Sequence, residues 1–398
     1  MNLRKNKRIG ILFIKTGLLG LASVSITPFY FVHSFCLGLA GIGFLMSIDN
    51  YFKILKLKVN LLFLILLLFL YISIKEFILY GRHLQLPGSY LFWVGLPFIY
   101  SSVSDKNQFI HKIVPQIFSL IILLIWIIGI YTIIQFIFKG IQGSYIAGHS
   151  HSYIIREEFS RFTGVHPPYF AMYCGYSILI LLNSMYWFPD ISNFKIHKLF
   201  KLISIFCFGL WILLLESRIH ILSLFLIIFI FKRKLRFITL ITLIILFSTV
   251  LLNPQSRFRE IVSGNDNSAL LRLESWKCGI QIFEKNHLFG IGINQLQNEL
   301  NNCYTGKSLL LKNMNTHNQF LHFAASGGIF GLLIFLILWG IIMVKLVQKH
   351  DLERLSLASF LLFSSLTENI FERHWGGILI GFFFLSLINL KKLHHEQS

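Results

Sequence analysis

Long apolar runs recur along the chain and restrict its fold more than any other feature of the sequence. Hydrophobic residues make up 55% of the 398 residues and charged residues 13%, and phenylalanine alone contributes 41. A run of about 20 apolar residues can cross a bilayer as a helix, and a backbone in lipid must satisfy its own hydrogen bonds. We therefore expect an all-α polytopic membrane protein with about twelve transmembrane helices and one large extracytoplasmic loop. The expected spans are 9–26, 29–48, 59–80, 90–103, 112–138, 167–187, 201–216, 219–231, 237–252, 326–345, 355–370 and 374–390.

Basic residues gather between alternate spans. Such clusters occur at 4–8, 53–58 and 232–236, whereas the short loops on the other side contribute only Arg82, Arg218 and Arg373. Lysine and arginine are enriched in cytoplasmic loops. We therefore expect both termini to be cytoplasmic. Most of the formal net charge of +19 then faces an anionic inner leaflet, and nucleic-acid binding is not expected.

A polar insert interrupts the apolar pattern at 253–316. It divides the chain into residues 1–252, with nine helices and an outer loop at 139–166, a periplasmic loop subdomain at 253–316, and residues 317–398, with three helices and a cytoplasmic tail. Cys278 and Cys303 both lie in this insert. Cysteines facing an oxidising compartment can pair, but sequence alone leaves open whether these two do.

Three polar residues near the expected outer face are candidates for chemistry. Arg218 precedes Lys232 by a helix of only about 21 Å, so it should lie below the outer membrane surface, where a guanidinium needs a ligand or a partner such as Glu216. Arg272 lies early in an amphipathic segment, and His317 precedes a span. A solvated helix face and an interfacial histidine are the alternative interpretations of these two residues.

Other chemistries are not favoured by the sequence. His317 and His322 are five residues apart and cannot share a helix face, so no metal site is expected there. No phosphate-binding glycine loop for a nucleotide is present, and no cofactor is expected. Carboxylates that could couple ion transport are nearly absent from the spans, where Glu76 and Glu368 are the closest candidates. This scarcity weighs against an ion-driven transporter.

Four sequence motifs occur in an order that resembles a known family. They are Arg161-Phe162-Thr163-Gly164-Val165-His166-Pro167; Glu216-Ser217-Arg218; Arg272 and Trp276 followed by His287-Leu288-Phe289-Gly290-Ile291-Gly292; and Thr316-His317-Asn318-Gln319-Phe320-Leu321 followed by Gly327-Gly328-Ile329-Phe330-Gly331. The order is similar to that of the O-antigen ligase and O-antigen polymerase superfamily of bacterial envelope glycan assembly. His287 stands where that family usually has proline. The resemblance covers roughly the middle and C-terminal two-thirds of the chain.

The resemblance implies an inner-membrane glycosyltransferase that acts at the periplasmic face in lipopolysaccharide biosynthesis. Such enzymes move a glycan from undecaprenyl pyrophosphate to an acceptor, here lipid A-core, by an inverting, metal-independent reaction. Carried over to this sequence, Arg218 and Arg272 would bind the pyrophosphate, with Arg161 as a further candidate. His317 would be the catalytic base.

Three alternatives stay open: a polysaccharide polymerase that uses the same donor, a protein O-oligosaccharyltransferase, and a lipid-linked glycan transporter. Sugar identity, linkage and oligomeric state cannot be inferred from the sequence. The proposed site also carries a geometrical condition. A continuous helix from His317 to Lys345 would be about 42 Å long, so the span must tilt strongly or break near Gly327 and Gly328 to bring His317 to the arginines.

Overall fold

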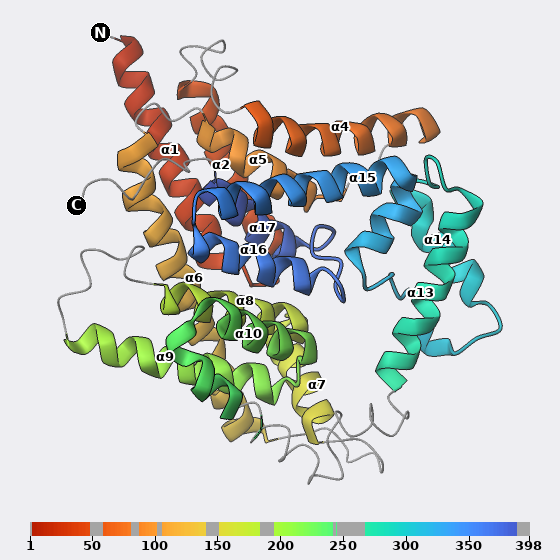
Figure 1. Ribbon diagram of the computed structural model, residues 1–398. Coiled ribbons are helices and arrows are strands. Elements are labelled where there is room, and N and C mark those ends of the chain that lie inside the picture. The colour runs from red at the N-terminus through yellow and green to blue at the C-terminus, as the bar shows by residue number, and fades with distance from the viewer. Residues whose placement is uncertain are drawn as a thin grey trace.

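The computed structural model describes residues 2–47, 59–80, 87–101, 106–140, 151–183, 195–241, 244 and 267–387. All regular secondary structure in these ranges is helical (Figure 1). The α-helices are α1 (Asn2–Val24), α2 (Tyr30–Ser47), α4 (Val59–Tyr80), α5 (Tyr90–Ser101), α6 (Lys106–Lys139), α7 (His151–Thr163), α8 (Pro167–Leu182), α9 (Lys195–Leu214), α10 (Arg218–Phe231), α13 (Asn267–Lys285), α14 (Ile293–Tyr304), α15 (Gln319–Gln348), α16 (Leu352–Ser364) and α17 (His374–Leu387). Two 3₁₀ turns are η3 (Arg233–Leu235) and η4 (Leu309–Leu311).

The helices are those of a membrane protein. Among the described residues, four helices are long and apolar enough to cross a bilayer, in α2, α4, α6 and α15. The pair α7 and α8 would make a fifth span, bent by 87°. Shorter apolar helices lie in α1, α5, α10 and α17. The all-α prediction is confirmed for the described ranges, whereas the count of twelve spans stays a prediction. Most of the expected span 237–252 and residues 253–266 of the insert lie outside the described residues.

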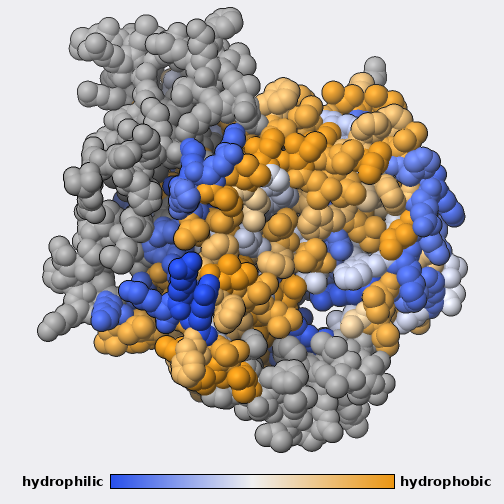
Figure 2. Space-filling model, viewed as in Figure 1, coloured by the Kyte–Doolittle hydropathy of each residue, from blue (hydrophilic) through white to orange (hydrophobic). Residues whose placement is uncertain are grey.

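The core of the bundle is built around α8 and α17. Nearly every side chain of these two helices is buried. The Tyr173 hydroxyl donates to the carbonyl oxygen of Trp375 at 2.9 Å, which joins α8 to α17. Figure 2 shows a broad apolar surface over the bundle, while hydrophilic residues gather at the right edge, where Figure 1 places α13 and α14.

Helix α15 is broken near its start, which meets the geometrical condition set by the sequence. Gly328 has φ +66° and ψ −164° within the helix. A Cβ at this position would lie 2.2 Å from the carbonyl oxygen of Leu288, so only glycine fits. The segment 287–292 crosses the break, and its amides bond α15: Ile291 N–H donates to Ala325 O at 3.1 Å, and Gly292 N–H donates to Ser326 O at 2.9 Å.

Polar side chains of α4 stabilise the same region. The Tyr71 hydroxyl donates to the carbonyl oxygen of Gly327 at 2.5 Å, and Lys75 Nζ donates to that of Ser326. Glu76 is 1% exposed and accepts the backbone N–H groups at the start of α14, including that of Asn294 at 3.4 Å. The Glu76 carboxylate therefore caps a helix N-terminus, where negative charge is favourable.

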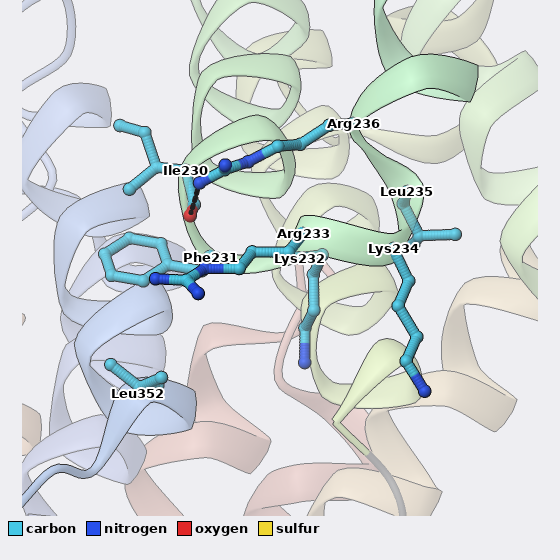
Figure 3. A pocket seen from close by; sticks show the side chains of 8 residues that line it. All are labelled: Ile230, Phe231, Lys232, Arg233, Lys234, Leu235, Arg236 and Leu352. Carbon is cyan, nitrogen blue, oxygen red and sulfur yellow. Dashed lines mark hydrogen bonds between the residues drawn. The ribbon is translucent and has the colours of Figure 1, made fainter.

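A hollow of about 600 Å³ lies at the opposite end of α10 from Arg218. It is lined by Ile230, Phe231, Lys232, Arg233, Lys234, Leu235, Arg236 and Leu352, and so contains one of the basic clusters expected on the cytoplasmic side. Arg236 folds back and donates from Nε to the carbonyl oxygen of Phe229 at 2.7 Å, at the C-terminus of α10. Lys232 and Lys234 point away from Arg236 in Figure 3.

Candidate functional site

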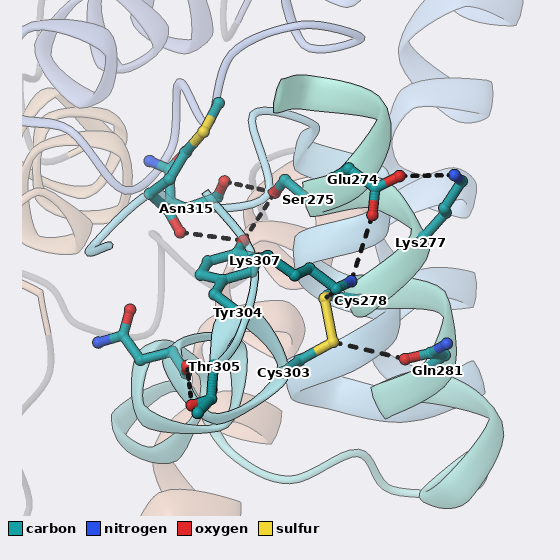
Figure 4. The surroundings of a disulfide bond; sticks show 12 residues. Glu274, Ser275, Lys277, Cys278, Gln281, Cys303, Tyr304, Thr305, Lys307 and Asn315 are labelled. Atoms are coloured by element: carbon teal, nitrogen blue, oxygen red, sulfur yellow. Dashed lines mark hydrogen bonds and ion pairs between the residues drawn. A yellow bond between two sulfur atoms is a disulfide. The ribbon is translucent and has the colours of Figure 1, made fainter. Parts of the chain in front are cut away.

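Helices α13 and α14 form a small second core beside the bundle. Buried Cys278 and Ile282 of α13 pack with Leu296 and Leu300 of α14. Cys278 and Cys303 form a disulfide across 25 residues of sequence (Figure 4). The pairing that the sequence left open is therefore present, and it fixes α13 against α14.

The turn that carries His317 is tied to α13. Ser275 Oγ donates to the carbonyl oxygen of Asn315 at 2.8 Å and accepts from the Tyr304 hydroxyl at 2.9 Å (Figure 4). The backbone N–H of His317 donates to Asn315 Oδ1 at 2.9 Å. His317 itself has φ +44°, a left-handed conformation that is uncommon outside glycine. The His317 turn is thus anchored to the helix that also presents Arg272.

Glu368 joins Arg272 to His317. Its side chain, in the connection between α16 and α17, is 5% exposed. Glu368 Oε1 accepts a hydrogen bond from Arg272 Nη2 at 3.1 Å, and Oε2 lies 3.5 Å from His317 Nδ1. A guanidinium and an imidazole that are 45 positions apart in the numbering therefore meet the two oxygens of one buried carboxylate.

The neighbouring charges decide how Glu368 ionises. Burial alone would raise the pKa of this carboxyl, but His317 and Arg272 outweigh burial and hold the pKa below its usual range. His166, in the connection between α7 and α8, is also within electrostatic range of Glu368. At neutral pH the site therefore holds a carboxylate at Glu368.

The turn between α9 and α10 carries Arg218. Glu216 has φ +42°, and Arg218 is the half-buried first residue of α10. His220, two residues further on, is within electrostatic range of Glu368 and Arg272. The start of α10 therefore faces the same region, whereas a contact of Arg218 with the Arg272–Glu368–His317 cluster stays a prediction.

Helix α7 carries two arginines, Arg156 and Arg161, whose side chains have different partners. Arg161 is 46% exposed on its side chain, and it pairs with Glu158 and lies over the Phe162 ring, with 4.9 Å from its guanidinium carbon to the ring centroid. Arg156 instead reaches the α9–α10 turn, where Nη1 donates to the carbonyl oxygen of Leu215 at 3.0 Å. Arg156 therefore contacts the turn that carries Arg218, and the sequence motif did not include this arginine.

Comparison with known families adds an independent observation. Residues 203–336 match the family model described as O-antigen ligase. We call this segment the O-antigen ligase domain, after the family that it matches. The match confirms the resemblance predicted from the sequence for these residues. No match was found among curated proteins.

The O-antigen ligase domain contains Arg218, Arg272 and His317, but neither Arg161 nor Glu368. Its matched segment also includes the broken part of α15 and the disulfide. Within the described ranges, no group of three or more His, Cys, Asp or Glu side chains could hold a metal ion.

The connection between α16 and α17 was the main omission of the sequence analysis. The expected span 355–370 ends earlier, because α16 stops at Ser364. Residues 365–373 bond to the O-antigen ligase domain instead: Phe371 N–H donates to Gln319 Oε1 at 2.9 Å, and Asn318 N–H donates to Asn369 Oδ1 at 2.8 Å. The available signal was the polar pair Glu368-Asn369 within an otherwise apolar run.

Proposed function

We propose that this protein transfers a glycan from undecaprenyl pyrophosphate to a sugar hydroxyl of lipid A-core, at the periplasmic face of the bacterial inner membrane. The O-antigen ligase family domain supports the ligase or polymerase type of activity. The contact of both Arg272 and His317 with Glu368 is the observation that carries the proposal. It supports a site in which a phosphate-binding cation and a base lie side by side.

In the proposed reaction, His317 is the general base. Its Nδ1 faces Glu368, so Nε2 is the nitrogen that faces away and accepts the proton of the acceptor hydroxyl. A carboxylate on Nδ1 fixes the tautomer and stabilises the imidazolium that forms. The acceptor oxygen attacks the anomeric carbon while the bond from that carbon to the diphosphate oxygen breaks. A single displacement of this kind inverts the anomeric centre.

The leaving group takes the electron pair as undecaprenyl pyrophosphate. Arg272 and Arg218 bind its phosphate oxygens, because a guanidinium donates two parallel hydrogen bonds and stays charged. Arg161 is a further candidate for contacts with the donor. These cations neutralise the developing charge without a metal or a cofactor.

Glu368 has a second role in the proposed reaction. Without donor, its carboxylate neutralises Arg272. A bound diphosphate competes for the same guanidinium and leaves Glu368 with His317. Donor binding therefore increases the share of the Glu368 charge that acts on the catalytic imidazole.

Deletion of the gene, followed by complementation, tests this function against the alternatives. The ligase predicts loss of surface polysaccharide on lipid A-core while long lipid-linked polymer accumulates. Single-repeat products would instead identify a polymerase, and altered glycoproteins with normal lipopolysaccharide a protein O-oligosaccharyltransferase. Polymer retained at the cytoplasmic face would identify a transporter. Near-wild-type transfer by His317→Ala would remove His317 from the catalytic role.

A further inference from the structure

We infer that Asn369, His322 and Glu372 form a chain of buried polar contacts that positions His317 for transfer. The inference rests on the proposed function, because it assigns these residues by their effect on the proposed base. It concerns groups of the α16–α17 connection and of α15 that are not expected to touch the substrate. We call them the positioning chain.

Asn369 forms hydrogen bonds with both residues that flank His317 in the sequence. Its Oδ1 accepts the backbone N–H of Asn318 at 2.8 Å and the hydroxyl of Thr316 at 3.2 Å. Asn369 is 1% exposed and Thr316 is fully buried. Water therefore cannot substitute for these contacts without opening the site. The residues on either side of His317 are held by one buried amide.

The orientation of this amide follows from its partners. A backbone N–H can only donate, so the Asn369 atom that faces Asn318 must be the oxygen. Nδ2 then faces His322, and it lies 3.2 Å from His322 Nδ1. Since Nδ2 is a donor, His322 Nδ1 must accept.

The other ring nitrogen of His322 faces Glu372. Its Nε2 lies 3.1 Å from Glu372 Oε1. The Tyr90 hydroxyl at the start of α5 also bonds to Oε1 of Glu372. Both histidine and glutamate side chains are nearly buried, at 8% and 11% exposed. Glu372 is therefore the next polar contact of the ring that holds Asn369.

The left-handed backbone of His317 explains why the positioning chain is needed. A non-glycine residue at φ +44° persists only when its surroundings hold it there. Asn315 holds the N–H of His317, and Asn369 holds Thr316 and Asn318. Loss of the positioning chain releases this turn and moves the His317 imidazole, although Arg272 and the donor site remain. The chain thus acts on the rate of transfer more than on donor binding.

The test uses the purified full-length protein with lipid-linked polymer extracted from cells that lack it, and with lipid A-core as acceptor. His322→Leu and Asn369→Leu should lower kcat by about tenfold or more while the KM for the polymer changes by less than about threefold. His322→Asn is the matched rescue, because its Oδ1 can stand where Nδ1 stands and accept from Asn369. His322→Gln places its amide toward Glu372 instead, so it should resemble His322→Leu.

The outcomes separate this inference from the proposed function. The positioning chain is wrong if His322→Leu keeps the wild-type kcat, if Asn and Leu at 322 behave alike, or if kcat falls only in proportion to folded yield. Those results would leave the proposed function standing as long as His317→Ala abolishes transfer. Transfer by His317→Ala would instead reject the catalytic role itself, whatever the variants at 322 do.

Discussion

The Oε2 atom of Glu368 lies 3.5 Å from Nδ1 of His317, in a connection where the Glu368 side chain is 5% exposed. A buried carboxylate on one nitrogen of a histidine is the arrangement that orients an imidazole base and stabilises its protonated form. The second oxygen of Glu368 binds Arg272. One side chain therefore couples the proposed base to the proposed phosphate site.

Replacement of Glu368 by Gln should separate these two roles. The amide can donate to His317 Nδ1 and favour the wrong tautomer, so we expect kcat to fall by roughly 100-fold or more. Donor affinity should stay equal or rise, because the anion that competes for Arg272 is gone. Steady-state transfer and donor binding measure the two effects. Glu299→Gln, on the exposed face of α14, is the control and should match the wild type. A fall in donor affinity with unchanged kcat would contradict the orienting role.

Arg272→Lys should test whether donor binding needs the two parallel hydrogen bonds that a guanidinium can donate. Lysine keeps the charge but loses the two parallel hydrogen bonds to phosphate oxygens. We expect donor affinity to weaken by about tenfold, the equivalent of roughly 1.4 kcal/mol, as measured by binding of lipid-linked polymer. Lys285→Ala, exposed at the end of the same helix, should leave affinity unchanged. Full affinity in Arg272→Lys would show that charge alone suffices.

Most of the membrane helices could be predicted because each one is specified by its own apolar run. Each expected span from 9–26 to 219–231 overlaps an observed helix, since the length and composition of an apolar run decide locally whether it forms a membrane helix. The boundaries of α15 and α16 were less predictable. Helix α15 begins at Gln319, seven residues before the expected start at 326, with Asn318 as its N-cap. Helix α16 stops at Ser364, where polar side chains turn to the site.

The candidate site was predictable only where a motif marked it. Arg218 and His317 stood out as polar residues at the ends of apolar runs, and Arg272 as a charge early in an amphipathic segment. The structure brings Arg272 and His317 together. Glu368 was visible as an acid in a span, but its partners depend on how α16, α17 and α13 meet. Such long-range contacts leave no periodic pattern in a single sequence. The same holds for Asn369 and His322, whose roles depend on the orientation of one amide.

Removal of the disulfide should loosen α13 and α14. Cys278→Ser with Cys303→Ser opens a loop of 25 residues, for which chain entropy gives a loss of about 3.5 kcal/mol. Because Arg272 lies on α13, transfer should decline at a lower temperature than in the wild type. Thermal unfolding and residual transfer after heating measure the loss. Cys207→Ser, at an unpaired cysteine of α9, is the control. An unchanged midpoint in the double variant would show that the small core alone suffices.

Two glycines of α15 should respond oppositely to the same substitution. Gly328 has φ +66°, and a Cβ there would lie 2.2 Å from the carbonyl oxygen of Leu288. Gly328→Ala should therefore destabilise the protein by at least about 3 kcal/mol, from the positive φ and the clash together. At Gly340 no atom lies within 4 Å of the Cβ position, so Gly340→Ala should be neutral or stabilising by up to about 1 kcal/mol.

Folded yield and the thermal midpoint of the two purified variants measure this difference. Gly328→Ala should also lose transfer in whatever fraction folds, because straightening α15 moves His317 away from Glu368. A well-folded Gly328→Ala with wild-type transfer would mean that the break is not needed to place His317. The proposed site would then need another explanation for the short path between the base and the arginines.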